Sequence, residues 1–119
     1  PARKRILLVD DNRDYVDSLA EVLRAEGNDV RVEHDGAAGL EAALAFRPEY
    51  AFLDIGMPGL NGFELARRLR DRAETREAIL VAVTGYSQPA DQVRGKEAGF
   101  DRYLVKPVEI DAVREILAA

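Results

Sequence analysis

Five short apolar runs, each followed by a stretch with helical spacing, limit the fold of this 119-residue sequence more than any other feature. Apolar runs of this length that end at polar or turn-forming residues are typical of β-strands, and those that are apolar throughout are typical of strands buried on both faces. The run 29–33 instead alternates apolar and polar residues, which predicts a strand nearer the sheet edge. The predicted strands cover residues 6–9, 29–33, 50–54, 79–83 and 102–105.

The segments between and after these runs have the spacing of amphipathic helices. Asn12 or Asp14 can cap the first helix, and Gly27 ends it. The helix that begins at Pro89 is expected to be marginal, because it contains Gly95 and few apolar residues. The apolar positions are Val16, Leu19, Ala20 and Leu23, then Ala37, Leu40 and Leu44, then Leu65 and Leu69, then Val93 and Ala98, and finally Ile110, Val113 and Leu117.

Regular alternation of strands and helices predicts one α/β domain over residues 1–119. Its strands are expected to be parallel, joined by right-handed crossovers, with helices on both faces of the sheet. The flavodoxin-like strand order 2-1-3-4-5 makes the first and third strands neighbours and opens a crevice at their carboxyl ends, where ligands bind in folds of this class.

Composition excludes several classes of function. A formal net charge of −5 disfavours a surface that contacts nucleic acid. The sequence has no cysteine, which excludes disulfides and thiol chemistry and is compatible with the cytoplasm. No apolar run approaches the roughly 18 residues of a membrane span, so no contact with a membrane is expected.

Polar residues follow the predicted strands at the edge where ligands are expected. Asp10 and Asp11 end the first strand, Asp54 the third, Thr84 the fourth and Lys106 the fifth. Close carboxylates repel one another unless they share a cation, and oxygen ligands without nearby histidine or cysteine suit Mg²⁺. A metal beside a lysine and a hydroxyl is a suitable place for a phosphoryl group, which an aspartate can accept as an acyl phosphate. The residues therefore predict Mg²⁺-dependent phosphorylation of Asp54.

Four segments together resemble the receiver domain of two-component response regulators, and the resemblance extends over essentially the whole chain. It implies that Asp54 accepts a phosphoryl group from a phosphohistidine of a sensor histidine kinase or a histidine phosphotransfer protein. It also implies that Asp11, Asp54 and the backbone carbonyl of Gly56 bind Mg²⁺ with help from Asp10. The segments are Ile6-Leu7-Leu8-Val9-Asp10-Asp11, Leu53-Asp54-Ile55-Gly56-Met57-Pro58-Gly59-Leu60-Asn61-Gly62, Val83-Thr84-Gly85 and Leu104-Val105-Lys106-Pro107.

The resemblance also implies how the signal leaves the site. Lys106 is expected to contact the phosphoryl group and to precede a cis peptide bond to Pro107. Thr84 and Tyr103 are the expected switch pair, whose rearrangement alters the surface of the fourth helix, fifth strand and last helix. That surface would control a downstream effector protein or an attached domain, with dimerisation on activation as one outcome. The domain would catalyse its own phosphorylation and dephosphorylation without being a turnover enzyme, either alone or within a larger regulator or hybrid histidine kinase.

Other functions fit the residues less well. An aspartate-nucleophile phosphatase needs a second aspartate two residues after the nucleophile, and neither Asp10 nor Asp54 has one. A dinucleotide- or flavin-binding module would have a glycine-rich phosphate loop after the first strand, where acidic residues stand instead. A degenerate receiver that only binds partners is disfavoured because the acceptor, acidic pair, hydroxyl and lysine are all present.

Several residues outside the motifs have simpler expected roles. Asn61 stands where the family often has aspartate and retains the ability to cap a helix. Gly85 stands where alanine is frequent, and its missing side chain is expected to admit water and speed dephosphorylation. His34 is expected to face solvent in a loop, and Arg67, Arg68 and Arg70 to lie on the outer face of their helix.

Overall fold

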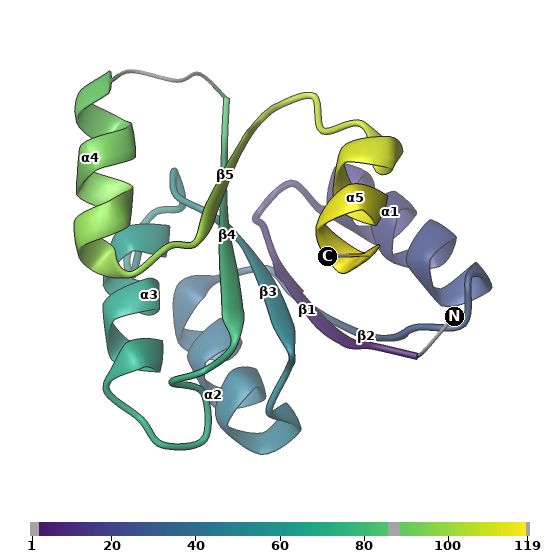
Figure 1. The fold of residues 1–119 in the computed structure, drawn as a ribbon, viewed down its shortest axis with the longest axis horizontal. Coiled ribbons are helices and arrows are strands. Elements are labelled where there is room, and N and C mark those ends of the chain that lie inside the picture. Colours follow the sequence, from purple (N-terminus) through teal and green to yellow (C-terminus); the bar gives the residue numbers. More distant parts are fainter. Residues whose placement is uncertain (1–2, 86–88, 119) are drawn as a thin grey trace.

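The computed structural model of the chain describes residues 3–85 and 89–118, so the terminal residues of the predicted domain and residues 86–88 lie outside the described ranges. Strands and helices alternate along the described chain (Figure 1). In chain order they are β1 (Arg5–Val9), α1 (Arg13–Ala25), β2 (Asp29–Glu33), α2 (Gly36–Phe46), β3 (Tyr50–Asp54), α3 (Gly62–Arg70), β4 (Ile79–Thr84), α4 (Pro89–Ala98), β5 (Arg102–Val105) and α5 (Ile110–Ala118). Each predicted strand and helix is present.

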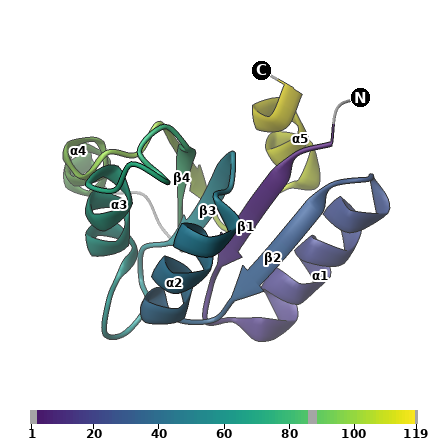
Figure 2. The same ribbon diagram turned by 90° about the horizontal axis from the view of Figure 1, so that it is seen from below.

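The five strands form one parallel sheet in the order β2-β1-β3-β4-β5, as predicted. Helices α1 and α5 cover one face, and α2, α3 and α4 cover the other (Figures 1 and 2). The half-buried strand β2 lies at an edge, and the fully buried strand β3 lies in the middle. Asp54 therefore ends the most enclosed strand of the sheet.

Alternating side chains of every strand except the edge strand β2 supply two separate cores. Ile6 and Leu8 of β1 pack with α1 and α5 residues such as Val16 and Val113. Leu7 and Val9 face the other way and pack with α2, α3 and α4 residues, among them Leu65. Burial on both faces explains why β1, β3 and β4 consist almost entirely of apolar residues.

Short polar side chains begin the first three helices. Asn12, rather than Asp14, caps α1 by accepting a hydrogen bond from the Tyr15 amide. Asp35 and Asn61 cap α2 and α3 in the same way. Helix α2 ends at Phe46, and Arg47 is its C-cap. A residue before proline avoids the right-handed helical conformation, and Arg47 does so by adopting the left-handed conformation, with φ = 51°, instead of an extended one.

Helix α4 is held by few side chains, as its sequence predicts. Its buried residues are Gly95 and Ala98, and Val93 is exposed. Gly99 follows it with φ = 109°, the conformation expected of a glycine C-cap. The guanidinium of Arg94 lies 4.2 Å from the centre of the Phe63 ring on α3, which adds a polar contact between the two helices.

Two side chains predicted to face solvent are half-buried, although His34 does lie in a loop as predicted. Arg67 and Arg68 are exposed, but Arg70 is half-buried and donates hydrogen bonds to the carbonyls of Ala78 and Gly99 and to the Asp101 carboxylate. His34 is also half-buried, and its Nε2 atom lies 3.1 Å from the Asp17 carboxylate on α1. Both side chains find partners distant in sequence, which a local pattern does not reveal.

The helices within residues 3–85 and 89–118 are too short or too polar to cross a lipid bilayer.

Candidate functional site

Three carboxylates meet at the carboxyl edge of the sheet. Each of Asp10, Asp11 and Asp54 offers one oxygen, and these oxygens all lie within 4.8 Å of one another. Asp10 and Asp54 are buried, with 3% and 7% of their surface exposed, whereas Asp11 is exposed. The parallel pairing of β1 with β3 creates this cluster, because it brings the ends of both strands to the same edge.

Backbone amides orient the two buried carboxylates. The Asn12 amide donates to Asp10 Oδ1 at 2.9 Å, and the Gly56 amide donates to Asp54 Oδ1 at 2.9 Å. Gly62 allows α3 to begin against the end of β3, since a Cβ atom there would lie 2.6 Å from the Asp54 carbonyl oxygen. The loop after Asp54 is thus folded tightly back behind the carboxylate.

Lys106 places an ammonium group inside the cluster. Its Nζ atom lies 2.9 Å from Asp10 Oδ2 and 3.7 Å from Asp54 Oδ2. The Lys106 amide donates to the Thr84 carbonyl at 2.7 Å, which fixes the lysine backbone beside the end of β4. The bond from Lys106 to Pro107 is cis, as the resemblance implied.

The environment of Asp54 disfavours its charged form. Burial is the largest influence and raises the pKa of the Asp54 carboxyl, and the nearby Asp10 charge raises it further. The Gly56 amide and the Lys106 ammonium act in the opposite direction, but the pKa remains above its ordinary value. A carboxylate in these surroundings is stabilised by added positive charge.

The expected switch residues lie on adjacent strands beyond this cluster. Thr84 is the buried last residue of β4, one position after the residue that pairs with Asp54. Tyr103 on β5 is half-buried, packs against the core under α4 and has a buried hydroxyl oxygen. Its ring lies beneath α4, where a Cβ atom added at Gly95 would be 3.5 Å from it.

Tyr15 also belongs to the site, and the sequence analysis missed it. Its ring lies on α1 with its centre 5.2 Å from Lys106 Nζ. Burial and the charges of Asp10 and Asp54 raise the pKa of the Tyr15 hydroxyl to about 12, so the hydroxyl is neutral at physiological pH. The available signal was position, because the first turn of a helix that follows β1 must begin at the same edge of the sheet.

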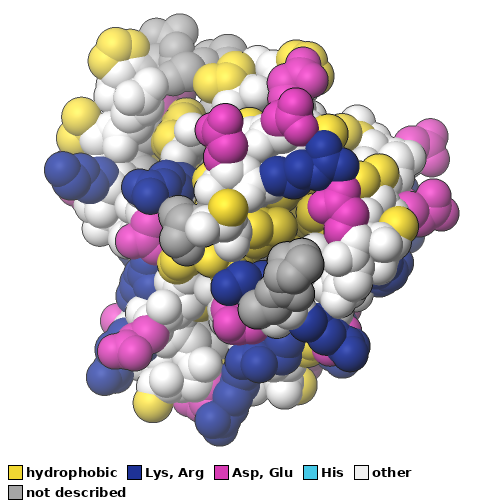
Figure 3. Space-filling model, turned by 45° about the vertical axis from the view of Figure 1, so that its right-hand side comes forward, with side chains coloured by type: hydrophobic (Ala, Val, Ile, Leu, Met, Phe, Trp, Pro, Cys, Tyr) yellow, Lys and Arg dark blue, Asp and Glu magenta, His cyan; other side chains and the backbone are white. Residues whose placement is uncertain are grey.

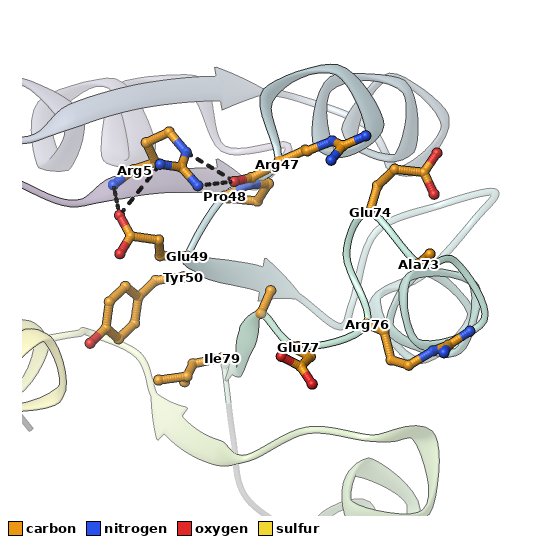
Figure 4. Close-up of a pocket in the computed structure, with 11 residues that line it drawn as sticks. Arg5, Arg47, Pro48, Glu49, Tyr50, Ala73, Glu74, Arg76, Glu77 and Ile79 are labelled. Atoms are coloured by element: carbon orange, nitrogen blue, oxygen red, sulfur yellow. Dashed lines mark hydrogen bonds and ion pairs between the residues drawn. The ribbon is translucent and has the colours of Figure 1, made fainter.

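A hollow of about 580 Å³ lies at the end of the sheet opposite the acidic cluster, where the strands begin. Figure 4 shows that Arg5 is held by its neighbours in this hollow: its guanidinium donates to the Arg47 carbonyl, and its backbone amide donates to the Glu49 carboxylate. Arg76 and Glu77 also line it. Since the strands begin here rather than end, the hollow lies away from the edge where this fold class binds ligands.

Comparison with known proteins agrees with this geometry. The sequence profile of the response regulator receiver domain matches residues 6–118. The chain belongs to this family. It is 36% identical over 115 residues to the protein PilH of Pseudomonas aeruginosa, covering 97% of this chain and 95% of PilH. It is 41% identical over 105 residues to the DNA-binding response regulator MtrA of Mycobacterium tuberculosis, covering 88% of this chain but only 45% of MtrA.

Solved structures have the same fold. A CheY-like receiver domain protein from Methanospirillum hungatei superposes with a TM-score of 0.90 at 30% identity, covering 98% of this chain and 92% of that one. The receiver domain of a sensor histidine kinase from Pseudomonas aeruginosa gives a TM-score of 0.87 at 28% identity, covering 98% and 95%. That structure has a magnesium ion coordinated in its active-site cleft.

The donor set of this receiver domain suits a hard divalent cation. Carboxylate oxygens are the ligands that Mg²⁺ prefers, and the three carboxylates bring more negative charge than Lys106 supplies. Asp11 is exposed at the mouth of the cluster, so a partly hydrated ion could reach it from solvent. The carboxylates of Asp10, Asp11 and Asp54 are the groups of this cluster that would hold such an ion.

Proposed function

We propose that this receiver domain is a phosphorylation-activated switch in which Asp54 accepts a phosphoryl group from a phosphohistidine of a sensor histidine kinase or histidine phosphotransfer protein. The observation that best supports the proposal is the position of Asp54, a buried carboxylate beside two other carboxylates and 3.7 Å from the Lys106 ammonium. Structural ion pairs of this kind exist without catalysis, but the surplus of negative charge over one ammonium favours a cation site.

In the proposed transfer, an oxygen of the ionised Asp54 carboxylate forms a bond to phosphorus while the P–N bond of the phosphohistidine breaks. The electron pair of that bond returns to the imidazole, which takes up a proton. Lys106 stabilises negative charge on the phosphoryl oxygens, and the Thr84 hydroxyl donates a hydrogen bond to one of them. Positioning and charge neutralisation of this kind are the main requirements of phosphoryl transfer.

Magnesium is the proposed cofactor, held by Asp10, Asp11, Asp54 and the Gly56 carbonyl. When bound, it would neutralise carboxylate charge and draw phosphoryl oxygens toward Asp54. The magnesium ion in the active-site cleft of the related kinase receiver domain supports this assignment. The domain would therefore promote its own phosphorylation and dephosphorylation without turning over an external substrate.

The proposed output surface consists of α4, β5 and α5. Two hollows flank β5, one of about 280 Å³ toward α4 and one of about 310 Å³ toward α5, and Tyr103 lines both. On the face that Figure 3 brings forward, hydrophobic side chains gather in a central band bordered by charged ones. Tyr103 and Thr84 would link this surface to Asp54 by favouring one of two pre-existing arrangements.

An effector protein or an attached domain would recognise the altered surface, with dimerisation as a further outcome. We propose that the domain acts in the cytoplasm, and we expect it to contact neither nucleic acid, which its net charge of −5 disfavours, nor a membrane. Relatives differ in context, since PilH is about as long as this chain and MtrA about twice as long. A separate regulator and a receiver within a larger chain, including a hybrid histidine kinase, both fit the proposal.

Acetyl phosphate as the phosphodonor tests the proposal directly. Intact mass spectrometry is expected to show one added phosphoryl group in the presence of Mg²⁺, and none with EDTA or in Asp54→Ala. Asp35→Ala, which changes an exposed aspartate at the α2 cap, is the matched control and is expected to retain phosphorylation. Folded protein, verified by circular dichroism, that gains no phosphoryl group would refute the proposal, as would unchanged labelling in Asp54→Ala.

A further inference from the structure

Tyr15 is the side chain at the acidic cluster for which the proposed function has no role. It stands on the first turn of α1, where its amide donates to the Asn12 cap at 3.2 Å. This bond fixes the start of the helix and therefore the direction from which the ring approaches the cluster. The ring is half-buried and, together with Asp10, Asp54 and Val108, lines a small cavity of about 10 Å³ beneath the site.

The Tyr15 ring and two carboxylates are all close to the Lys106 ammonium. Nζ lies 2.9 Å from Asp10 Oδ2, 3.7 Å from Asp54 Oδ2 and 5.2 Å from the centre of the Tyr15 ring. This last distance is within the range in which a cation is attracted to an aromatic face. Lysine has a flexible four-carbon stem and a compact charge, so its ammonium stays in one place only where neighbours confine it.

We infer that Tyr15 is a positioning residue, whose aromatic face holds the Lys106 ammonium beside Asp54 so that it meets the incoming phosphoryl group. The inference rests on the proposed phosphorylation of Asp54 and adds to it the residue that confines the lysine. The hydroxyl is not required, because the attraction comes from the ring face. The hydroxyl is neutral at physiological pH because its pKa is raised to about 12, so it adds no negative charge to an acidic site.

Two substitutions separate the ring from the hydroxyl. Tyr15→Phe retains the aromatic face and removes only the hydroxyl, whereas Tyr15→Leu retains apolar bulk and removes the ring. Rates of phosphorylation by acetyl phosphate in the presence of Mg²⁺ are expected to fall about three- to tenfold in Tyr15→Leu, the range that corresponds to the usual strength of a cation–aromatic contact. Tyr15→Phe is expected to phosphorylate at the rate of the parent protein. Equal loss in both variants, or none in Tyr15→Leu, would overturn the inference.

A double-mutant cycle with Lys106→Ala distinguishes positioning from general packing. If Tyr15 acts through the lysine, Tyr15→Leu will slow phosphorylation in the parent protein but not further in Lys106→Ala. A purely structural role for Tyr15 would give the same fractional loss in both backgrounds, which would refute the inference. Leu23→Val, a change at a buried residue of the same helix that does not line the cavity beneath the site, shows how much rate is lost through α1 packing alone.

A measurement without phosphorylation keeps this inference separate from the proposed function. In metal-free protein, the ring current of Tyr15 is expected to shift the NMR signals of the Lys106 ε-methylene protons upfield. The shift should persist in Tyr15→Phe and disappear in Tyr15→Leu. If the parent protein accepts no phosphoryl group but shows this pattern, the proposed function fails while the Tyr15–Lys106 contact stands; if phosphorylation occurs and the shift is absent, the positioning role is refuted.

Discussion

Replacing Arg70 by alanine should destabilise the domain far more than replacing another arginine of the same helix. The Arg70 guanidinium donates to three carbonyl groups and one carboxylate, which lie in the α3–β4 connection and in the turn between α4 and β5. Asp101, its carboxylate partner, also accepts the Leu80 amide at 2.9 Å. One side chain thus ties the end of α3 to the beginning of β4 and to the turn after α4.

The size of the effect follows from these acceptors. A hydrogen bond that involves a charged group contributes about 1.5–3 kcal/mol, but exposed ion pairs contribute only about 0–1 kcal/mol. The Arg70 side chain is 24% exposed, so water can replace part of what alanine removes. We therefore expect a loss of about 2–4 kcal/mol, a large share of the roughly 5–15 kcal/mol by which domains are stable.

Urea unfolding followed by circular dichroism measures this loss in the free energy of unfolding. Arg67→Ala is the matched control, because Arg67 is exposed one turn earlier and its loss should change stability by about 0.5 kcal/mol or less. Arg70→Lys retains the charge but not the planar fork of donors, so it should recover less than half of the loss. Equal stability of the Arg70→Ala and Arg67→Ala variants would show that water satisfies the acceptors and would refute the reasoning.

Four further predictions concern the site. The raised pKa of Asp54 means that the folded protein binds the proton more tightly than the unfolded chain, so ionisation of Asp54 at pH 7 destabilises the fold and Asp54→Asn should raise the melting temperature. This gain in melting temperature should shrink as pH falls through the raised pKa. A gain that stays constant in a pH series of melting curves would contradict the prediction. Gly62→Ala should cost about 1–3 kcal/mol in urea unfolding because its Cβ meets backbone, whereas Gly56→Ala should cost less than about 1 kcal/mol. Mg²⁺ at a hundred times its Kd should add about 2.7 kcal/mol to the free energy of unfolding, and Asp11→Asn should weaken this effect. Gly85→Ala should leave stability nearly unchanged and lengthen the lifetime of the phosphorylated form in a phosphate-release time course, and a lifetime equal to that of the parent protein would contradict this.

The fold could be predicted because its main determinants are local and periodic. A run such as 50–54 must be buried on both faces, and alternation with helices leaves few arrangements other than a parallel sheet with two covered faces. Polar residues at strand ends then had to meet at one edge, which predicted the proximity of Asp10, Asp11, Asp54 and Lys106. Their roles in phosphoryl transfer remain a proposal, because proximity alone does not establish chemistry.

Contacts between elements distant in sequence could not be predicted in the same way. Arg70 and Asp101 are 31 residues apart, and their pairing depends on how the turn after α4 meets the end of α3. Tyr15 and Lys106 meet only because α1 and the end of β5 approach the same edge, and neither residue has a neighbour in sequence that indicates the other. Helical spacing identified the exposed side of α3 correctly for Arg67 but not for the last residue of the helix.

The two ends of the sheet differ in how their charges are balanced, and this difference is the strongest reason for placing function at one of them. At the amino end, Arg5 and Glu49 lie beside one another near the surface, with 48% and 41% of their side chains exposed, so solvent screens them and the group needs no further ion. At the carboxyl end, Asp10 and Asp54 are buried and share the Lys106 ammonium with Asp11 close by, so the cluster keeps a surplus of negative charge where water is scarce. Burying such a surplus costs stability unless a cation offsets it. Among residues 3–85 and 89–118, the cluster at the carboxyl edge bears this cost and the Arg5–Glu49 pair does not, which is consistent with selection for what the charges bind rather than for stability.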